Sequence, residues 1–525
     1  MTSSVSKETK EMQWGRVLIC GGTDWPKLGR KERGGKGEGN PDAPDLLEPH
    51  ILRSLSNVKI TSIHGSCCAC HFIAIDIHGA AWMFGRNGPH CALGLTTTDS
   101  ISECAPRRLL PVEIGAELGT KFVHAACGRS HSLLVDSAGR AWSAGANSFG
   151  QCGHAITSQI STFKTIDGPY VGGERQRVVK AAAGISFSIL LTESGKLFSF
   201  GSGEKGQLGN GRTGEHITTG NKTGFDIEAN PIPVKGLDDK VIRDIASGSQ
   251  HTIAIDSQGV VYVWGYNGYC RLGLGNQQDA LIPRVVPQFT GPNEITMGAQ
   301  VVAGPTNSVV IDKQRMYWMA GKWKNSGEGS AGSPYSSFRY IQDLMGCKIS
   351  TASCGGVTHF ALTTDEDGGV MTVAYGQNAA NGELGLGPDE PKSATKPTRH
   401  QPLSGIEVFS IAAGQHTTLF LAQPNDNFSE LPRHPTEVDA PDLCLVCRKD
   451  NGDDDSPLEC DKCDRPYHLE CLSPPLPTVP DGEWFCPQCT NEMGALADCN
   501  PRGDERVGAK RKAPAAKENA PKRKK

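Results

Sequence analysis

Glycine recurs at the same intervals in three successive stretches of the chain, and this repeat constrains the fold more than any other feature. Within each stretch, four glycines are separated by 11, 6 and 8 residues. The three sets are Gly128, Gly139, Gly145 and Gly153; Gly184, Gly195, Gly201 and Gly209; and Gly248, Gly259, Gly265 and Gly273. Apolar or alternating stretches lie between them, such as HSLLVDSAG followed by RAWSAG. Each copy therefore predicts two short strands joined by a tight turn.

Degenerate copies extend the repeat over residues 14–424. Three of them end at Gly85, Gly321 and Gly376, and a seventh copy is divided between the two ends of the region. Its first half is VFSIAAGQHTTLFLA, which ends at Ala422, and its second half is GRVLICGGTDW, residues 15–25. Repeats of this length with four strands each indicate a β-propeller, in which a divided blade removes open sheet edges. The sequence therefore predicts an all-β fold built on a seven-bladed propeller.

Eight cysteine and histidine residues near the C-terminus have the spacing of zinc ligands. They form the pattern Cys-x2-Cys-x12-Cys-x2-Cys-x4-His-x2-Cys-x14-Cys-x2-Cys. The residues are Cys444, Cys447, Cys460, Cys463, His468, Cys471, Cys486 and Cys489. A two-residue gap lets a turn aim both side chains at one ion, so four pairs fit two tetrahedral sites. With four ligands each, the two zinc ions are expected to be structural, because so short a segment buries too little core to fold alone.

A disulfide framework is the alternative use of these cysteines. The chain begins with the polar segment MTSSVSKETK, which has no apolar signal region, and this disfavours export and oxidised cysteines. No apolar run approaches the roughly 18 residues needed to cross a bilayer, so no membrane partner is expected.

The order of the ligands resembles the plant homeodomain (PHD) finger, because His468 is fifth and Trp484 lies two residues before Cys486. A RING finger would carry a Cys in fifth place and its His one place earlier. The position of His468 therefore disfavours a ubiquitin ligase, which is a second alternative function. The resemblance implies a cross-braced domain with interleaved ligands. One ion would be held by Cys444, Cys447, His468 and Cys471, and the other by Cys460, Cys463, Cys486 and Cys489.

The propeller repeat resembles the regulator of chromosome condensation family, whose copies end in Gly-Gln-Leu-Gly. Residues 206–209 read GQLG and residues 382–385 read GELG. The segments ICGGTDWPKLGRKE, GSCCACHF and WGYNGYCRLG are similar to the telophase-disc branch of that family. The resemblance implies that the propeller binds a protein partner. Since the sequence has no catalytic motif, we expect no enzyme activity, and the family implies guanine-nucleotide exchange on a small GTPase as an alternative.

Carboxylates surround the second ligand pair of the finger. Asp461 and Asp464 flank Cys463 in the sequence CDKCD, and Asp442 precedes the first ligand. PHD fingers that bind the unmodified histone tail beginning Ala-Arg-Thr-Lys use carboxylates at these positions for the Arg and the Lys. Carboxylates suit a planar guanidinium and an unmethylated ammonium group, whereas trimethyl-lysine needs aromatic walls. The finger offers few aromatic residues, namely Tyr467, Trp484 and Phe485.

The resemblance also implies where the histone peptide would lie. It would add as an antiparallel strand beside Leu458 and Glu459, with its free amine received by carbonyls of residues 479–482, Gly482 included. The alternative is that the aspartates only solvate the surface of a small domain.

Charge divides the C-terminal part of the chain in two. Residues 441–492 contain twelve acidic and four basic residues, a net charge of −8, whereas residues 493–525 carry +6. Basic clusters at residues 510–512 and 522–525 resemble a bipartite nuclear-import signal and are able to make weak contact with nucleic acid. We therefore expect a nuclear, chromatin-associated adaptor. Its parts are a disordered N-terminus (1–13), the propeller (14–424), an extended linker (425–440), the finger (441–492) and a disordered basic tail (493–525).

Two further groups of metal-type residues are assigned to packing. Cys67, Cys68, Cys70 and His71 lie at the start of a strand, where alternate side chains point to opposite faces. His131 and His251 recur at the period of the repeat, which indicates an architectural role.

Overall fold

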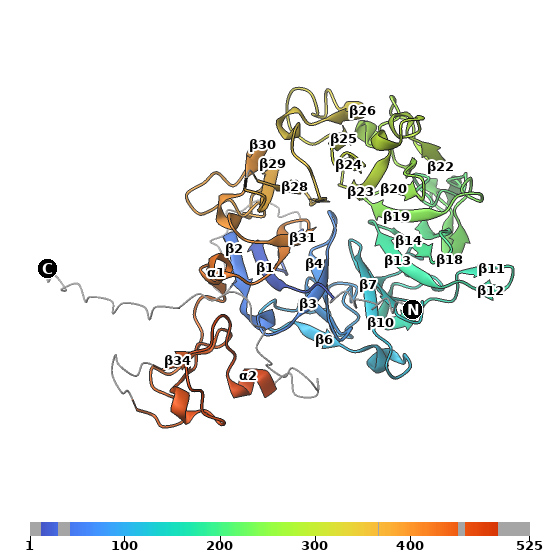
Figure 1. Ribbon diagram of the computed structural model, residues 1–525. Helices are drawn as coiled ribbons and strands as arrows, with labels where there is room; N and C mark the ends of the chain where they lie inside the picture. Colours follow the sequence, from blue (N-terminus) through green and yellow to red (C-terminus); the bar gives the residue numbers. More distant parts are fainter. Residues whose placement is uncertain (1–11, 30–42, 366, 450–456, 492–525) are drawn as a thin grey trace, which may run out of the picture.

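The computed structural model describes residues 12–29, 43–365, 367–449 and 457–491. Within them, seven sheets surround a common axis, and a small domain lies against the outside of the ring (Figure 1). The predicted fold, a seven-bladed propeller followed by a small finger with two zinc-type clusters, is confirmed.

Six blades are continuous in sequence, and each is a four-stranded antiparallel sheet in which the strands follow chain order. The first three contain β3 (Ile60–His64), β4 (His71–Asp76), β5 (Ala81–Gly85), β6 (Arg107–Leu109); β7 (Phe122–Cys127), β8 (His131–Asp136), β9 (Ala141–Ala146), β10 (Gln159–Thr165); and β13 (Val178–Ala183), β14 (Phe187–Thr192), β15 (Leu197–Ser202), β18 (Ile227–Pro233). The next three contain β19 (Ile242–Ser247), β20 (His251–Asp256), β21 (Val261–Gly265), β22 (Ala280–Val285); β23 (Gly298–Ala303), β24 (Asn307–Asp312), β25 (Tyr317–Gly321), β26 (Tyr335–Tyr340); and β27 (Thr351–Cys354), β28 (Thr358–Thr364), β29 (Val370–Gly376), β30 (Ala394–Arg399).

The loops between these strands contain short hairpins and 3-10 helices. Two hairpins are formed by β11 (Tyr170–Val171) with β12 (Glu174–Arg175), and by β16 (His216–Thr218) with β17 (Lys222–Gly224). The 3-10 helices of the ring are η1 (Arg53–Leu55), η2 (Pro111–Ile114), η3 (Gly268–Cys270), η4 (Pro287–Phe289), η5 (Glu294–Thr296), η6 (Gln342–Leu344) and η7 (Gln401–Leu403).

The seventh blade joins the two ends of the repeat region, as the sequence predicted. Its strands are β31 (Val408–Ala413), β32 (Thr417–Ala422), β1 (Arg16–Gly21), β2 (Leu46–Leu52) and β33 (Arg433–His434). Strand β1 pairs with β32 over six consecutive residues, from Arg16 opposite Ala422 to Gly21 opposite Thr417. All residues of β1 and β32 are buried, so the strands that close the ring also contribute to its hydrophobic core.

An aspartate at the end of the second strand organises the turn of the repeat. In Asp136, Oδ1 accepts the backbone N–H of Arg140, and Oδ2 accepts the indole N–H of Trp142 at 2.9 Å. Asp76 and Asp312 make the same pair of contacts, and the tyrosine hydroxyl replaces the indole in the blade of Asp256. The turn glycine Gly139 has a φ of +78°, a conformation that side chains rarely adopt. The regular spacing of the glycines therefore reflects a hydrogen-bonded side-chain network as well as a turn.

The repeating histidines connect neighbouring blades. His131 Nε2 lies 2.9 Å from the hydroxyl of Ser188 in the next blade, and His251 makes the same contact with Ser308. His71 contacts Ser132 in the same way at 2.8 Å. Burial lowers the pKa of His131 to about 4, so the imidazole is neutral and bonds a hydroxyl. The assignment of these residues to packing is confirmed.

The expectation of an extended linker after the propeller is wrong for residues 425–434. Asn425 caps the short helix α1 (Asp426–Ser429) by accepting the backbone N–H of Phe428, whose side chain is buried against the split blade. Strand β33 then pairs in parallel with β2, with Arg433 opposite Ile51. A buried phenylalanine and a strand pairing outweigh the polar composition from which the tether was predicted.

Candidate metal centres and peptide-binding face

The finger has little apolar core of its own. It consists of β34 (Leu458–Glu459), β35 (Pro466–Tyr467), η9 (Leu469–Cys471) and α2 (Pro487–Asn491). Its buried cluster consists of Tyr467 and Leu472 with the ligand cysteines Cys460, Cys486 and Cys489. Two side chains of moderate size do not stabilise a domain, so the finger depends on its ligand clusters.

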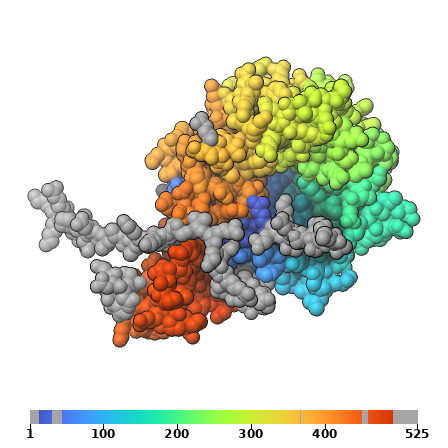
Figure 2. Space-filling view, in the orientation of Figure 1, coloured from blue at the N-terminus to red at the C-terminus, as the bar shows by residue number. Residues whose placement is uncertain are grey.

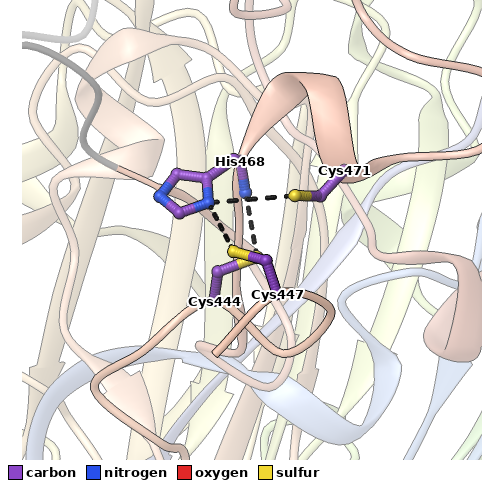
Figure 3. A group of neighbouring side chains, drawn as sticks. All are labelled: Cys444, Cys447, His468 and Cys471. Carbon is purple, nitrogen blue, oxygen red and sulfur yellow. Dashed lines mark hydrogen bonds between the residues drawn. The ribbon is translucent and has the colours of Figure 1, made fainter. Parts of the chain in front are cut away.

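The first ligand cluster brings together Cys444, Cys447, His468 and Cys471 (Figure 3). His468 Nδ1 faces the cysteines and lies 3.2 Å from Cys447 Sγ and 3.9 Å from Cys471 Sγ. Burial opposes ionisation of Cys444, but backbone N–H groups of Cys447, His468 and Val446 lower its pKa to about 6. A thiolate and an imidazole nitrogen aimed at one point are the donors of a structural zinc site.

The second cluster brings together Cys460, Cys463, Cys486 and Cys489. Cys463 Sγ and Cys486 Sγ are 3.8 Å apart, which matches the edge of a tetrahedron with Zn–S bonds of about 2.3 Å. Hydrogen bonds from Cys460 and Cys489 hold the pKa of Cys486 far below its ordinary value. The predicted interleaved pairing is confirmed, and the two donor sets fit two structural zinc ions.

The predicted histone-contact residues are divided between exposed and engaged positions. Asp442, Glu459 and Gly482 are exposed and Leu458 is half-buried. Gly482 has a φ of +80° with open space around it. Although the Glu459 side chain is exposed, partial desolvation and the charge of the neighbouring Asp464 raise its pKa, whereas the charge of Arg433 opposes this shift.

Asp461 is almost fully buried, and both of its oxygens accept hydrogen bonds. Oδ2 accepts the backbone N–H of Trp484 at 2.6 Å, and Oδ1 accepts Nη2 of Arg433 at 2.9 Å. The first contact shapes the finger itself, because it links the two halves of the second zinc cluster. The second contact places the guanidinium of a residue from β33 on this carboxylate.

Asp464 is engaged by the propeller. Arg53 of η1 donates to both of its oxygens, with Nη1–Oδ1 and Nη2–Oδ2 distances of 2.6 and 2.7 Å. Arg53 also donates to the carbonyls of Lys462, Pro435 and Thr436, so it ties the linker and the finger to the ring.

Further contacts complete the seam between finger and propeller. Arg16 of β1 forms an ion pair with Glu483 at 2.9 Å and lies over the ring of Phe485. Asn57 donates to the carbonyl of Cys489 at 2.7 Å and accepts from Lys462. The space-filling view shows the orange-red finger directly against the orange segment that closes the propeller (Figure 2). Sequence reasoning missed this seam, since no motif marks Arg16, Arg53 or Asn57.

The linker is fixed by a buried ion pair. His434 Nε2 lies 2.6 Å from Glu103 Oε1, and Cys104 Sγ lies 3.7 Å from the same nitrogen. Burial alone would lower the pKa of His434, but hydrogen bonds to Cys104 and Glu103 raise it to about 9. The indole N–H of Trp25 bonds the other oxygen of Glu103, which keeps the carboxylate satisfied.

The aromatic rings of the finger are used in packing. Tyr467 is 5% exposed and meets Trp484 edge to face at 5.8 Å, while Phe485 contacts Arg16. In the described part of the finger, therefore, no aromatic ring is left to build a wall around a methylated lysine.

Strand β34 has one edge directed away from its partner. It pairs with β35, with Leu458 opposite Tyr467, and the N–H of Cys460 bonds the carbonyl of Arg465. Because hydrogen-bonded and non-bonded pairs alternate in antiparallel strands, the N–H and C=O of Glu459 point to the other edge. Within residues 457–491, no backbone partner is found for Glu459.

Two other sequence expectations receive no structural description. The basic clusters predicted for nuclear import and nucleic-acid contact lie outside the described residues.

Across the described ranges, no helix has both the length and the hydropathy required to traverse a bilayer.

Comparison with known proteins agrees with both domains. Residues 16–420 match the family model for the RCC1-like domain, and residues 444–489 match that for the PHD-finger, which leaves the RING alternative without support. Protein RCC2 homolog of Xenopus laevis is 31% identical over 448 residues, covering 80% of this chain and 81% of that protein. Human Protein RCC2 is 31% identical over 427 residues, covering 78% and 76%.

A solved structure shares the propeller fold. Human WBSCR16 superposes with a TM-score of 0.60 at 22% identity, covering 78% of this chain and 99% of that one. Together with the sequence matches, the seven-bladed ring and the two ligand clusters, this shows that the chain belongs to the RCC1-like propeller family, in the branch of the RCC2 proteins, and carries a C-terminal PHD finger.

Proposed function

We propose that this chain is a nuclear, chromatin-associated adaptor. Its finger binds the unmodified histone tail beginning Ala-Arg-Thr-Lys, and its propeller binds a protein partner. The observation that supports the proposal most is the hydrogen bond from the Arg433 guanidinium to the Asp461 carboxylate, close to the edge of β34 that faces away from β35.

The strand edge and the carboxylates suit different parts of one peptide. An extended peptide that pairs with Glu459 would gain main-chain hydrogen bonds, as in other cases of strand addition. Its arginine side chain would meet Asp461, two residues after the end of β34. A guanidinium held by a carboxylate is a strong, charge-assisted contact, and Asp461 already accepts one hydrogen bond from the guanidinium of Arg433.

The absence of spare aromatic rings within residues 457–491 supports an unmethylated lysine. The exposed carboxylates Glu459 and Asp442 are able to accept hydrogen bonds from an ammonium group, and each methyl group removes one donor proton. The acidic finger would add long-range attraction to a basic tail.

The proposal is tested by calorimetry of the zinc-loaded full chain with three histone peptides. These are the unmodified peptide, the peptide trimethylated at the lysine and the peptide acetylated at its amine. We expect the unmodified peptide to bind most tightly. Tighter binding of the trimethylated peptide contradicts the proposal that carboxylates of the finger bind an unmethylated lysine. No binding of any peptide contradicts histone binding altogether.

Guanine-nucleotide exchange on a small GTPase is the second candidate, favoured by membership of the RCC1-like family. When the purified chain is used as bait in nuclear extract, the recovered proteins separate the two candidates. Recovery of a small GTPase supports nucleotide exchange, whereas recovery of a scaffold protein supports the adaptor. Release of labelled GDP from a captured GTPase then decides whether the chain acts as an enzyme. We propose that it does not, and that the propeller serves as a binding surface.

A further inference from the structure

Arg433 is held in place by the fold of the linker. It lies in β33, which pairs with β2 of the split blade, and its neighbour His434 is fixed by the buried ion pair to Glu103. The preceding helix α1 is anchored by the buried Phe428. These contacts place the side chain of Arg433 against the finger before any peptide binds.

The contact that Arg433 makes is incomplete. Its Nη2 donates to Asp461 Oδ1 at 2.9 Å, while its Nε is buried without a hydrogen-bond partner in the described residues. The exposed fraction of its side chain is 25%. Its partner Asp461 follows Glu459 by two residues, so the contact lies close in sequence to the strand edge proposed for the peptide.

Arg53 provides the contrast within the same seam. It donates to both oxygens of Asp464 and to three carbonyls, and only 7% of its side chain is exposed. Such a saturated guanidinium anchors the finger to the ring. Within the described residues, Arg433 donates one hydrogen bond and keeps a buried Nε–H without a partner, so it is the arginine that a ligand would replace more easily.

We infer that Arg433 is a built-in competitor for the peptide. The guanidinium of the linker occupies the carboxylate that the histone arginine requires, and binding of the tail displaces it while Arg53 keeps the finger docked. This inference rests on the proposed function and adds its regulation. The apparent affinity for the histone tail is reduced to the fraction of molecules in which Arg433 is not bound to Asp461.

A pair of variants measures this competition in the full chain. Arg433→Ala removes the competitor, and Lys449→Ala removes one positive charge from an exposed position on the finger. The loss of one charge-assisted hydrogen bond corresponds to about tenfold in affinity, so Arg433→Ala should bind the Ala-Arg-Thr-Lys peptide about tenfold more tightly. Lys449→Ala should change the affinity less than about threefold, because an exposed charge is screened by solvent and salt.

A second peptide separates competition from a general change of charge. In the peptide Ala-Ala-Thr-Lys the arginine is absent, so Arg433→Ala should give no gain in its affinity. Zinc content and the melting curve show whether each variant is folded, and Arg433→Gln replaces Arg433→Ala if the latter loses zinc.

The outcomes distinguish the inference from the function on which it rests. Equal affinity of wild type and folded Arg433→Ala for the arginine peptide overturns the competition and leaves histone reading intact. Weaker binding by the variant also overturns it, because Arg433 would then support the site. Failure of every folded variant to bind either peptide overturns both the proposed function and the inference.

Discussion

Arg53 of the propeller and Asp464 of the finger are 411 residues apart in sequence and form a two-point ion pair with distances of 2.6 and 2.7 Å. The same arginine holds the carbonyls of Pro435 and Thr436 in the linker. One side chain thereby joins the ring, the linker and the finger. The PHD finger is a docked part of the molecule, and its acidic residues are partly used within the chain.

Arg53→Ala is expected to loosen the finger. Loss of a charged, hydrogen-bonded pair costs about 1.5 to 3 kcal/mol, so the docking of the finger should weaken by that order. Hydrogen exchange at residues 461–464 should rise, while the inner strands of the ring stay protected. The matched control is Arg339→Ala, whose ion pair with Glu328 is exposed and should contribute little. Unchanged exchange at residues 461–464 contradicts the anchoring role.

Cys460→Ala is expected to unfold the finger and spare the propeller. The variant removes one ligand of the second cluster and part of the small core, both of which depend on zinc. Bound zinc should fall below two ions per chain, and the propeller should melt separately, at a slightly lower temperature because the docked finger is lost. Cys347→Ala, in the ring, should retain two ions. Retention of two ions by Cys460→Ala is incompatible with the assigned ligands.

The ion pair between His434 and Glu103 predicts a pH-dependent stability. The folded pKa of His434 is about 9, above its ordinary 6.5, so its contribution is complete below about pH 6.5 and is lost as the pH rises through 9. The full shift corresponds to at most about 3 kcal/mol. Denaturant unfolding of wild type and His434→Gln should therefore differ most near pH 6 and converge near pH 10. A difference that stays constant over this range would rule out the charged pair.

Nuclear import is expected to depend on the basic tail. Deletion of residues 508–525 removes both basic clusters and should abolish nuclear accumulation of a fluorescent fusion. Neutralising either cluster alone should weaken accumulation, because a bipartite import signal requires both of its basic clusters. Undiminished nuclear fluorescence after the deletion shows that import uses another route.

The ring could be predicted from sequence because its signal is repeated. The intervals between Gly139, Gly145 and Gly153 reflect turns and close strand contacts that recur in each copy, and the aspartate at the strand end is visible in the same register. The eight zinc ligands could be identified from their spacing, whereas their interleaved pairing was expected only from the resemblance to the PHD finger and is shown by the structure.

The seam between finger and ring could not be predicted in this way. Arg53 lies in a short 3-10 helix without a motif, and its partner Asp464 lies 411 residues away in the sequence, in a domain whose linker pairs with β2 through β33. The docked linker did have a weak signal: Asn425 followed three residues later by Phe428 is a helix cap with an apolar anchor. The histone contacts stay a prediction, which the peptide-binding experiments test.

The most direct test of histone-tail binding by the carboxylate is the affinity of the unmodified Ala-Arg-Thr-Lys peptide for the full chain with Arg433→Ala and Asp461→Asn together, compared with Arg433→Ala alone. In the Arg433→Ala background, the loss of the contact to the peptide is not offset by the loss of the contact to Arg433. Asparagine keeps an oxygen to accept the N–H of Trp484 but removes the charge that faces a guanidinium. Binding by the double variant should be at least about tenfold weaker than binding by Arg433→Ala, as expected for the loss of a charge-assisted hydrogen bond, while two zinc ions stay bound. Equal affinity of the folded, zinc-loaded double variant and Arg433→Ala would show that the carboxylate does not bind the tail.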